Sequence, residues 1–538
     1  MTKDVGRLCP LSYISSLAKA GALERAWHLF EESGYLDLQC DSAALAVKGR
    51  LLAERAFRSS GETQRVVFGE AAHAFDCADR IQGAPWLRNN VATYSLLSGD
   101  IEGAQKCARE VLDRLSNQDN FAETAYHVAA TRAESSLIVG DLDCAERAMR
   151  DAANYSCENF EDRAGTLKRL SRICLALGAK QEWLEPFRPP SSVHFVGHMG
   201  FLSGKDAEHA LAGDVEAFLT RQRVGFAYGA LAAGADLIFA ERALDFGAKL
   251  HVILPTAVDI FGRQSVEVFG QDWLRRFESA LARAASVVTL TRVAGLHDAS
   301  ATQLAGEVGM GSAILNAKLL AGRASQYVVF DEKGGGAHTA NLALRWPKEN
   351  WDQHVYVAKR DGRKTYARDP IAVLPDRECL ATLNIKLDAN GFSAEDEIFL
   401  VEEIENIIIK CVELHPPLHY ISHDGGWKLS YITPAEAVIA GSEIKSLAEI
   451  AGVFFSIRGD YGVVQWNIDN ISGAMNSYKL GKSISSLGYE RFGSPDTFVV
   501  DQSFVAALAV DQTIHFSVEP IDYQDPDEES LFALTSIR

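Results

Sequence analysis

A group of glycines and two acidic residues in the stretch 192–255 have the types and spacing of a crevice that can bind a phosphate at the ends of strands. The group follows a predicted strand at 192–196 and surrounds the start of a predicted helix. The candidate residues are Gly197, His198, Met199, Gly200, Gly229, Gly234, Asp236 and Glu241. Glycines at a strand exit let backbone N–H groups approach a phosphate, and a helix N-terminus adds partial positive charge. An acid near the start of such a helix can bind ribose hydroxyls or orient a water.

The same residues have a structural explanation that the sequence leaves open. The glycines can simply permit tight packing of a strand on a helix, with Asp236 as a cap of the helix. His194 and His198 lie four residues apart around the strand exit. They are either a metal-binding pair or one packed and one loop histidine.

Asp388 marks a second candidate site. It follows the predicted strand 381–387 directly and precedes a glycine turn at Gly391. An aspartate at the end of an apolar strand is well placed to hold a divalent metal over a triphosphate.

The region that precedes both sites, residues 1–188, is rich in alanine and leucine and is predicted to be all-helical. Gly21, Gly99 and Gly140 each begin a recurring sequence motif, in which an aliphatic residue follows two positions later and an alanine follows three positions after that. We interpret the recurrence of this motif as the sign of an array of helix–turn–helix repeats. The glycine ends one helix in a left-handed conformation, and the small alanine lets the next helix pack closely.

Residues 191–358 alternate predicted strands and helices, which favours a mostly parallel sheet covered by helices. The predicted strands are 192–196, 250–254, 286–290, 327–330 and 354–357. A polar linker is predicted at 359–376. Residues 377–520 then follow the order strand–helix–strand–strand–helix–strand, the ferredoxin-like split pattern.

The end of the chain is predicted as separate short elements. We expect a helix at 473–486, a strand at 497–500, a short helix at 501–508 and an edge strand at 515–518. The acidic segment 521–538 is predicted to be a solvated tail.

Composition limits the classes of function. The length of 538 residues predicts roughly three to four domains. The net charge of −19 argues against nucleic-acid binding. Neither a signal peptide nor a membrane-spanning run is found, so we expect a cytoplasmic protein. The nine cysteines contain no CxxC pair, which argues against disulfides and a zinc site.

Together with His251-Val-Ile-Leu-Pro255 and Asp272-Trp273, the crevice residues resemble the SLOG superfamily over about 192–345. The resemblance implies a Rossmann-like sheet and a pocket for a nucleotide or nucleotide-derived ligand. It also places Glu241 at the position of the catalytic glutamate of the superfamily's glycosidic hydrolases. The turn 229–236 lacks the proline and threonine of those hydrolases, so binding without hydrolysis is our primary expectation.

The recurring sequence motif of residues 1–188 resembles tetratricopeptide-like repeats of the TRAFs-binding type. This resemblance implies a protein or peptide partner on the helical region. A rigid spacer is the alternative.

The segment Asp388-Ala-Asn-Gly391-Phe392-Ser393 resembles the first metal-binding motif of class III nucleotide cyclases, and the resemblance extends over about 378–520. It implies a cyclase-type fold, a homodimer, and metal ligands at Asp388 and Asp424. The hairpin at Asp424 inverts the family's order of glycine and aspartate, and Ser485 and Tyr489 replace an asparagine and an arginine. These departures, with Lys386 on the strand, predict a domain that has lost its activity.

Our leading hypothesis is a cytoplasmic signalling or regulatory protein. The helical repeats bind a partner, the SLOG-like region binds a nucleotide-type small molecule, and the cyclase-like region dimerises or regulates. The alternatives are an active divergent cyclase, which would need Mg²⁺ or Mn²⁺, a nucleotide N-glycosidic hydrolase, and a scaffold without ligands. Neither nucleic acid nor membrane is an expected partner.

Overall fold

The computed structural model describes residues 10–19, 22–117, 123–155, 159–199, 205–291, 299–331, 336–358, 377–387, 394–423, 426–453, 455–468, 470, 475–481, 497–511, 513–521 and 530–537. The chain divides into two compact units. The first comprises residues 1–189 with 319–321, and the second comprises 190–318 with 322–538.

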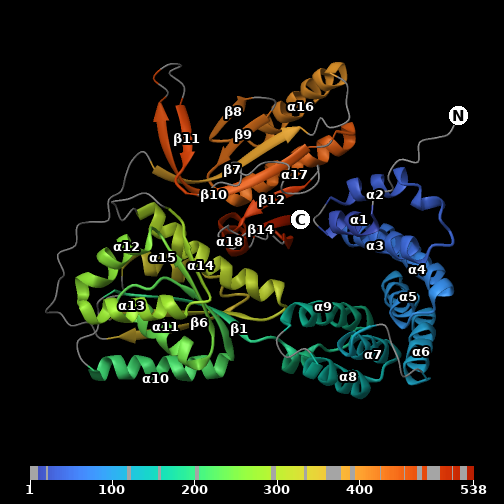
Figure 1. Ribbon diagram of the computed structural model, residues 1–538, viewed down its shortest axis with the longest axis horizontal. Coiled ribbons are helices and arrows are strands. Elements are labelled where there is room, and N and C mark those ends of the chain that lie inside the picture. Colours follow the sequence, from blue (N-terminus) through green and yellow to red (C-terminus); the bar gives the residue numbers. More distant parts are fainter. Residues whose placement is uncertain are drawn as a thin grey trace. The chain divides into compact units, whose positions relative to one another are not determined.

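The described part of the first unit is helical (Figure 1). Its α-helices are α1 (Leu11–Lys19), α2 (Leu23–Glu32), α3 (Ser42–Arg58), α4 (Gly61–Gln82), α5 (Pro85–Ser98), α6 (Ile101–Asn117), α7 (Ala125–Val139), α8 (Leu142–Tyr155) and α9 (Phe160–Leu177). Short 3₁₀ helices lie at Tyr35–Asp37 and Glu182–Phe187. From α3 to α8, each helix packs on the next one along the chain.

The recurring glycine motif has the predicted structure at the two copies that the structure describes. Gly99 and Gly140 end α5 and α7 with φ of 102° and 91°, a left-handed conformation that glycine adopts without strain. Ala104 and Ala145 on the following helices are fully buried. Gly21 lies outside the described residues.

The second unit begins with a six-stranded parallel sheet. Its strands are β1 (Ser191–Gly197), β2 (Val224–Gly229), β3 (Lys249–Leu254), β4 (Ser286–Thr289), β5 (Ala324–Asp331) and β6 (Asp352–Ala358), in the spatial order β4-β3-β2-β1-β5-β6. The chain therefore reverses direction across the sheet between β4 and β5, and β1 and β5 flank that switch point. In such sheets, ligands bind outside the carboxyl ends of the strands.

Helices cover this sheet on both faces. The helices α10 (Lys205–Gln222), α11 (Ala235–Phe246) and α13 (Gln271–Arg283) pack on one face around an apolar core, and α14 (Ala299–Leu319) and α15 (Ala337–Arg345) lie against the other (Figure 1). Between β3 and α13 the chain forms α12 (Val258–Phe261), a π turn at Gly262–Val266 and a 3₁₀ turn at Glu267–Phe269. The mostly parallel, covered sheet is confirmed, whereas β2 was not predicted as a strand.

An eight-stranded mixed sheet completes the second unit. Its strands are β7 (Arg377–Leu387), β8 (His419–His423), β9 (Gly426–Tyr431), β10 (Phe455–Ile468), β11 (Met475–Lys479), β12 (Phe498–Asp501), β13 (Phe516–Ile521) and β14 (Leu531–Ile537). The helices of this region are α16 (Ala394–Leu414), α17 (Pro434–Ala451) and α18 (Gln502–Val510). The spatial order is β13-β14-β12-β10-β7-β9-β8, and β11 pairs with β10.

Two predictions for this region are wrong. Residues 475–479 form strand β11, antiparallel to β10, where a helix over 473–486 was expected. Residues 531–537 form β14 between β12 and β13, so this part of the predicted tail belongs to the sheet. The apolar side chains Leu531 to Leu534 are buried there, which explains why this segment pairs despite the acids before it.

Across the described residues, none of the helices combines the length and apolarity needed to cross a membrane.

Candidate ligand-binding site

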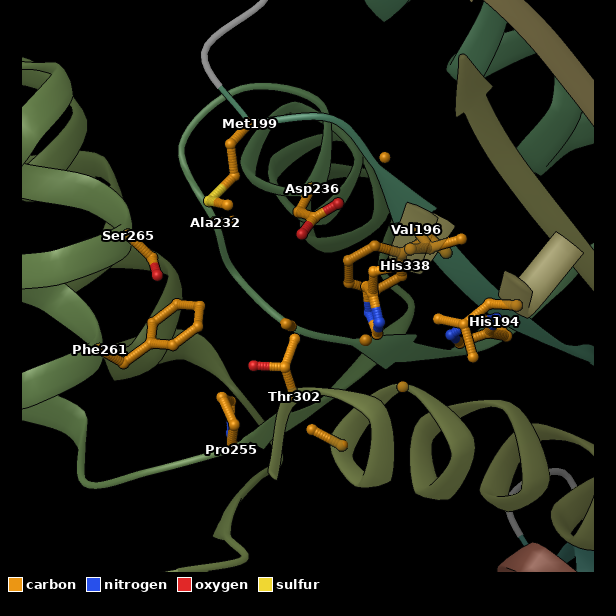
Figure 2. A pocket seen from close by; sticks show the side chains of 17 residues that line it. His194, Val196, Met199, Ala232, Asp236, Pro255, Phe261, Ser265, Thr302 and His338 are labelled. Carbon is orange, nitrogen blue, oxygen red and sulfur yellow. The ribbon is translucent and has the colours of Figure 1, made fainter. Parts of the chain in front are cut away.

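A cavity of about 80 Å³ lies at the carboxyl ends of β1, β2 and β3, beside α14 and α15 (Figure 2). It is lined by His194, Phe195, Val196, Gly197, Met199, Gly229, Ala230, Ala232, Asp236, Pro255, Phe261, Ser265, Thr302, Ala305, Gly306, His338 and Leu342. In Figure 2, Asp236 and Met199 lie on one side of the cavity, and Pro255 and Thr302 lie on the other. The position matches the crevice that a doubly wound sheet offers to ligands.

Four of the predicted residues line this cavity: Gly197, Met199, Gly229 and Asp236. His198 is buried beside it, where its Nδ1 accepts the backbone N–H of Gly336 at 3.4 Å. Gly200 lies outside the described residues.

Gly197 and Gly229 are glycines because neighbouring groups leave no room for a side chain. A Cβ on Gly197 would lie 2.3 Å from Cβ of Ala235, and a Cβ on Gly229 would lie 2.7 Å from the ring of Phe195. Both distances are far below van der Waals contact. Tight packing, the alternative left open by the sequence, thus accounts for these two positions.

Gly234 is the N-cap of α11 and has φ of 113° and ψ of −125°, a conformation that residues with a Cβ rarely adopt. Its backbone forms an isolated antiparallel bridge with Met199. This bridge ties the exit loop of β1 to the start of α11, and it thereby places Asp236 at the cavity.

Asp236 is the most unusual group in the cavity. Only 7% of the residue is exposed, and its Oδ1 has no hydrogen-bond partner within the described chain. Burial raises the pKa of the carboxyl to about 8, although hydrogen bonds from the backbone of Gly197 and Ala232 oppose this shift. At neutral pH the carboxyl is therefore mostly protonated, and it can donate a hydrogen bond into the cavity.

A row of polar side chains crosses the face of the sheet that α14 covers. One residue of each strand lies at the same level, in the order Ser286, His251, Tyr228, His194, Gln326 and Gln353. The rings of Tyr228 and His251 stack at 4.7 Å, and the His251 Nδ1 and Ser286 Oγ are 2.8 Å apart. Parallel strands buried on both faces are usually apolar, so this row is a specific feature of the sheet.

The row fixes the tautomer of His194. Gln353 Nε2 donates to the backbone carbonyl of Ala343 and to Gln326 Oε1, which orients the Gln326 amide. Gln326 Nε2 then donates to Nδ1 of His194 at 3.0 Å. A neutral imidazole that accepts at Nδ1 carries its proton on Nε2, and this N–H has no hydrogen-bond partner in the described part of the chain.

The charge state of the cavity follows from burial. Burial, with a smaller contribution from His338, lowers the pKa of His194 to about 3, and burial lowers that of His338 to about 4. Both rings are therefore neutral at pH 7. Among the described residues that line the cavity, none is an arginine or a lysine. The described part of the cavity lining is thus electrically neutral and offers hydrogen-bond donors.

Glu241 is not among the residues that line the cavity. Its carboxylate accepts two hydrogen bonds from Arg276, at 2.6 and 2.7 Å, and Arg276 also pairs with Glu208 at 2.7 Å. The arginine lies over the ring of Trp273 at 4.2 Å. This arrangement holds α11 against α13, so the position of Glu241 favours a structural role over catalysis.

Both candidate metal ligands of the second site, Asp388 and Asp424, lie outside the described residues, as do Ser485 and Tyr489. Lys386 is exposed on β7. Within the described ranges, no group of three or more His, Cys, Asp or Glu side chains is arranged to hold a metal ion.

A buried ion cluster is present in the second sheet. Lys479 Nζ lies 2.6 Å from Asp501 and 3.3 Å from Asp460. Asp501 also accepts the backbone N–H of Phe504 at 2.7 Å and caps α18. Lys479 and the backbone N–H groups thus provide partners for the Asp501 carboxylate from within the chain.

Sequence reasoning missed His338, Thr302 and the donor role of His194. The first two come from α15 and α14, far from the glycine motif in sequence, and carry no local signal. The small residues Gly306, Gly309 and Gly311 of α14 were a usable signal, because such spacing indicates close backbone approach.

No protein-family model matches the sequence, and a comparison with curated proteins finds no match. Solved structures of nucleotide cyclase domains are similar to part of the chain. The guanylyl cyclase domain of RhoGC from Blastocladiella emersonii has 9% identity and a TM-score of 0.25, covering 30% of this chain and 98% of that one. The adenylyl cyclase CyaB from P. aeruginosa has 9% identity and a TM-score of 0.26, covering 30% and 96%.

The guanylate cyclase domain of RhGC from Catenaria anguillulae, solved in complex with GTP, has 10% identity and a TM-score of 0.25, covering 30% of this chain and 98% of that one. At these values the likeness carries no conclusion about activity or ligand.

Proposed function

We propose that this protein is a regulatory protein that binds a nucleotide or nucleotide-derived small molecule in the cavity around Asp236. The observation that carries the proposal is the buried carboxyl group of Asp236, which lines a cavity and has one oxygen without a hydrogen-bond partner among the described residues. A buried polar atom without a hydrogen bond costs about 1–3 kcal/mol. A ligand that supplies the missing hydrogen bond removes this free-energy cost, which favours ligand binding at this site.

The size and charge of the cavity specify which part of the ligand enters. Its volume of about 80 Å³ is small, since pockets that enclose whole ligands have roughly 300–1,000 Å³. An ionised phosphate would meet neither arginine nor lysine among the lining residues that the structure describes, and burying it unpaired would be costly. We therefore assign a neutral group, such as a base edge or a sugar, to the cavity, with any phosphate outside it.

The remaining regions complete the proposal. The parallel order β4-β3-β2-β1-β5-β6 supports a Rossmann-like, SLOG-type assignment for 191–358. The order β10-β7-β9-β8 supports a ferredoxin-like, cyclase-type assignment for the second sheet. We assign that region a dimerisation or regulatory role and the helical region a protein partner.

The test is calorimetric titration of the full-length chain with AMP, ATP, GTP and NAD. We expect one of these to bind with one site per chain. Ala230→Leu enlarges a side chain of the cavity wall and should weaken that binding at least about tenfold, whereas Ala282→Leu on the exposed surface of α13 should not. If none of the four compounds binds, the proposal is wrong.

An assay for catalysis separates the alternatives. Each nucleoside triphosphate is incubated with the chain and Mn²⁺, and the products are analysed by mass spectrometry. We expect neither a cyclic nucleotide nor a free base. A cyclic product lost in Asp388→Ala would establish a cyclase, and a free base lost in Glu241→Gln would establish a hydrolase.

A further inference from the structure

Helix α14 (Ala299–Leu319) is buried on nearly all sides. Its sequence has no polar face, as expected for a helix enclosed by other elements. It lies within the second unit, and its contacts on two opposite faces belong to different sheets.

One face of α14 forms a wall of the cavity. Thr302, Ala305 and Gly306 line the cavity, and a Cβ on Gly309 would lie 3.5 Å from the His194 ring. A Cβ on Gly306 would lie 2.5 Å from Leu342 and 2.9 Å from His338. At Gly306 and Gly309, the backbone of α14 therefore approaches α15 and the His194 ring without an intervening side chain.

The opposite face of α14 contacts the second sheet. Successive residues of a helix are rotated by about 100°, so Ser300, Glu307 and Gly311 lie on the far side from the cavity. A Cβ on Gly311 would lie 1.8 Å from the carbonyl oxygen of Ala506, so the backbones of α14 and α18 touch. Ser300 accepts a hydrogen bond from the Cys379 thiol of β7 at 3.6 Å.

Glu307 connects three elements at this contact. Only 5% of the residue is exposed. Its carboxylate pairs closely with Arg345 of α15, and its Oε2 accepts the hydroxyl of Tyr461 of β10 at 3.2 Å. Because α15 also supplies His338 and Leu342 to the cavity, two of the helices that line the cavity, α14 and α15, are joined to β10 through this one carboxylate.

We propose that α14 transmits occupancy of the cavity to the second sheet, with Glu307 and Tyr461 as the coupling pair. This inference rests on the proposed function, since it assumes an occupant for the cavity. Small residues on both faces leave few side-chain rotations to absorb a displacement of the helix. A group that enters beside Thr302 and Gly306 therefore shifts or restrains α14 as a rigid body, and α18 and β10 respond.

The test is hydrogen exchange of the full-length chain, read on peptides from α18 and β10. The cavity is filled in two ways, by Ala230→Leu and by saturating AMP. Each is measured with Tyr461 intact and in Tyr461→Phe, which removes only the hydroxyl that reaches Glu307. Ala230→Val is the milder substitution if Ala230→Leu does not fold.

We expect filling to slow exchange of α18 at least about fivefold with Tyr461 intact, and less than about twofold in Tyr461→Phe. Peptides from α6 in the first unit serve as the internal control. Unchanged exchange in α18 on filling, or an equal change in both backgrounds, would overturn the coupling.

Failure of the coupling and failure of the proposed function give different results. If Ala230→Leu slows exchange of α18 but AMP does not bind, the coupling stands and AMP is excluded as the occupant. If a nucleotide binds and the exchange of α18 stays constant, the binding function stands without the coupling.

Discussion

The two sheets of the second unit each bury an aspartate at the start of a helix, and the two aspartates differ in how they are satisfied. Asp501 caps α18 and receives Lys479 at 2.6 Å, together with backbone N–H groups. Asp236 lies in the first turn of α11 and faces a cavity, and its Oδ1 finds no hydrogen-bond partner in the part of the chain that the structure describes. The chain neutralises the first carboxylate with a lysine and keeps the second neutral by protonation.

This difference separates a structural group from a candidate site. A buried carboxylate saturated by its own chain has nothing left to offer a ligand. A buried neutral carboxyl beside empty space can exchange one hydrogen bond with a ligand at little cost.

Lys479→Met should be strongly destabilising, because it removes the cation that lies 2.6 Å from the buried Asp501 and 3.3 Å from the buried Asp460. Breaking a buried ion pair in this way costs about 3–5 kcal/mol. Urea denaturation of the full-length chain measures the loss. Lys410→Met, on an exposed position of α16, is the matched control and should change the stability by less than about 0.5 kcal/mol.

The pH dependence of stability tests the protonated state of Asp236. Its pKa is about 8 in the folded chain and about 4 when unfolded, so between these values the folded state holds a proton that the unfolded chain releases. Its contribution to stability should therefore be full below pH 4 and decline as pH rises towards 8, by up to about 1.4 kcal/mol per pH unit. Asp236→Asn should remove this slope in urea denaturation. The slope should persist in the control variant Asp245→Asn. A slope that also persists in Asp236→Asn would contradict the protonated state of Asp236.

Gly229→Ala distinguishes a packing role from a phosphate-binding role. The added Cβ meets the Phe195 ring at 2.7 Å, so we expect a loss of about 1–3 kcal/mol in unfolding free energy. Gly309→Ala is the matched control, because its Cβ meets only ordinary contacts near 3.5 Å; its stability should change by less than about 1 kcal/mol. Normal stability with lost nucleotide binding in Gly229→Ala would instead support a phosphate cradle.

Glu241→Gln should cost only about 1 kcal/mol, because the partly exposed Arg276 keeps its second partner, Glu208. Nucleotide affinity in calorimetry should be unchanged, since Glu241 does not line the cavity. A large drop in affinity would restore Glu241 to the site.

Much of this fold could be predicted from the sequence, and the exceptions have physical reasons. Five strands of the first sheet are apolar runs bounded by turn residues. Strand β2 was missed because Gly225 and Gly229 are typical of a turn; in the structure, a Cβ on Gly225 would lie 2.4 Å from Pro190. Strand β14 was missed because the acids before it suggested a tail, although 531–534 is an apolar run.

The site was predictable in part. Asp236 was identified by its place after the glycine turn. Glu241 was paired with it, yet residues five apart on a helix are about 140° apart, so both cannot face one cavity. The polar row through His194 could not be predicted, because the level of each side chain depends on strand register, which a single sequence does not define.

On the proposed function, Asp236 presents a neutral hydrogen-bond donor to the ligand. The most direct measurement is calorimetric titration of AMP, ATP, GTP and NAD into the wild type, Asp236→Asn and Asp236→Leu at pH 7. Asn keeps a donor of the same shape, so its affinity for the bound compound should stay within about threefold of wild type, whereas Leu should weaken binding at least about tenfold. Equal affinity in Asp236→Leu and wild type would contradict the account.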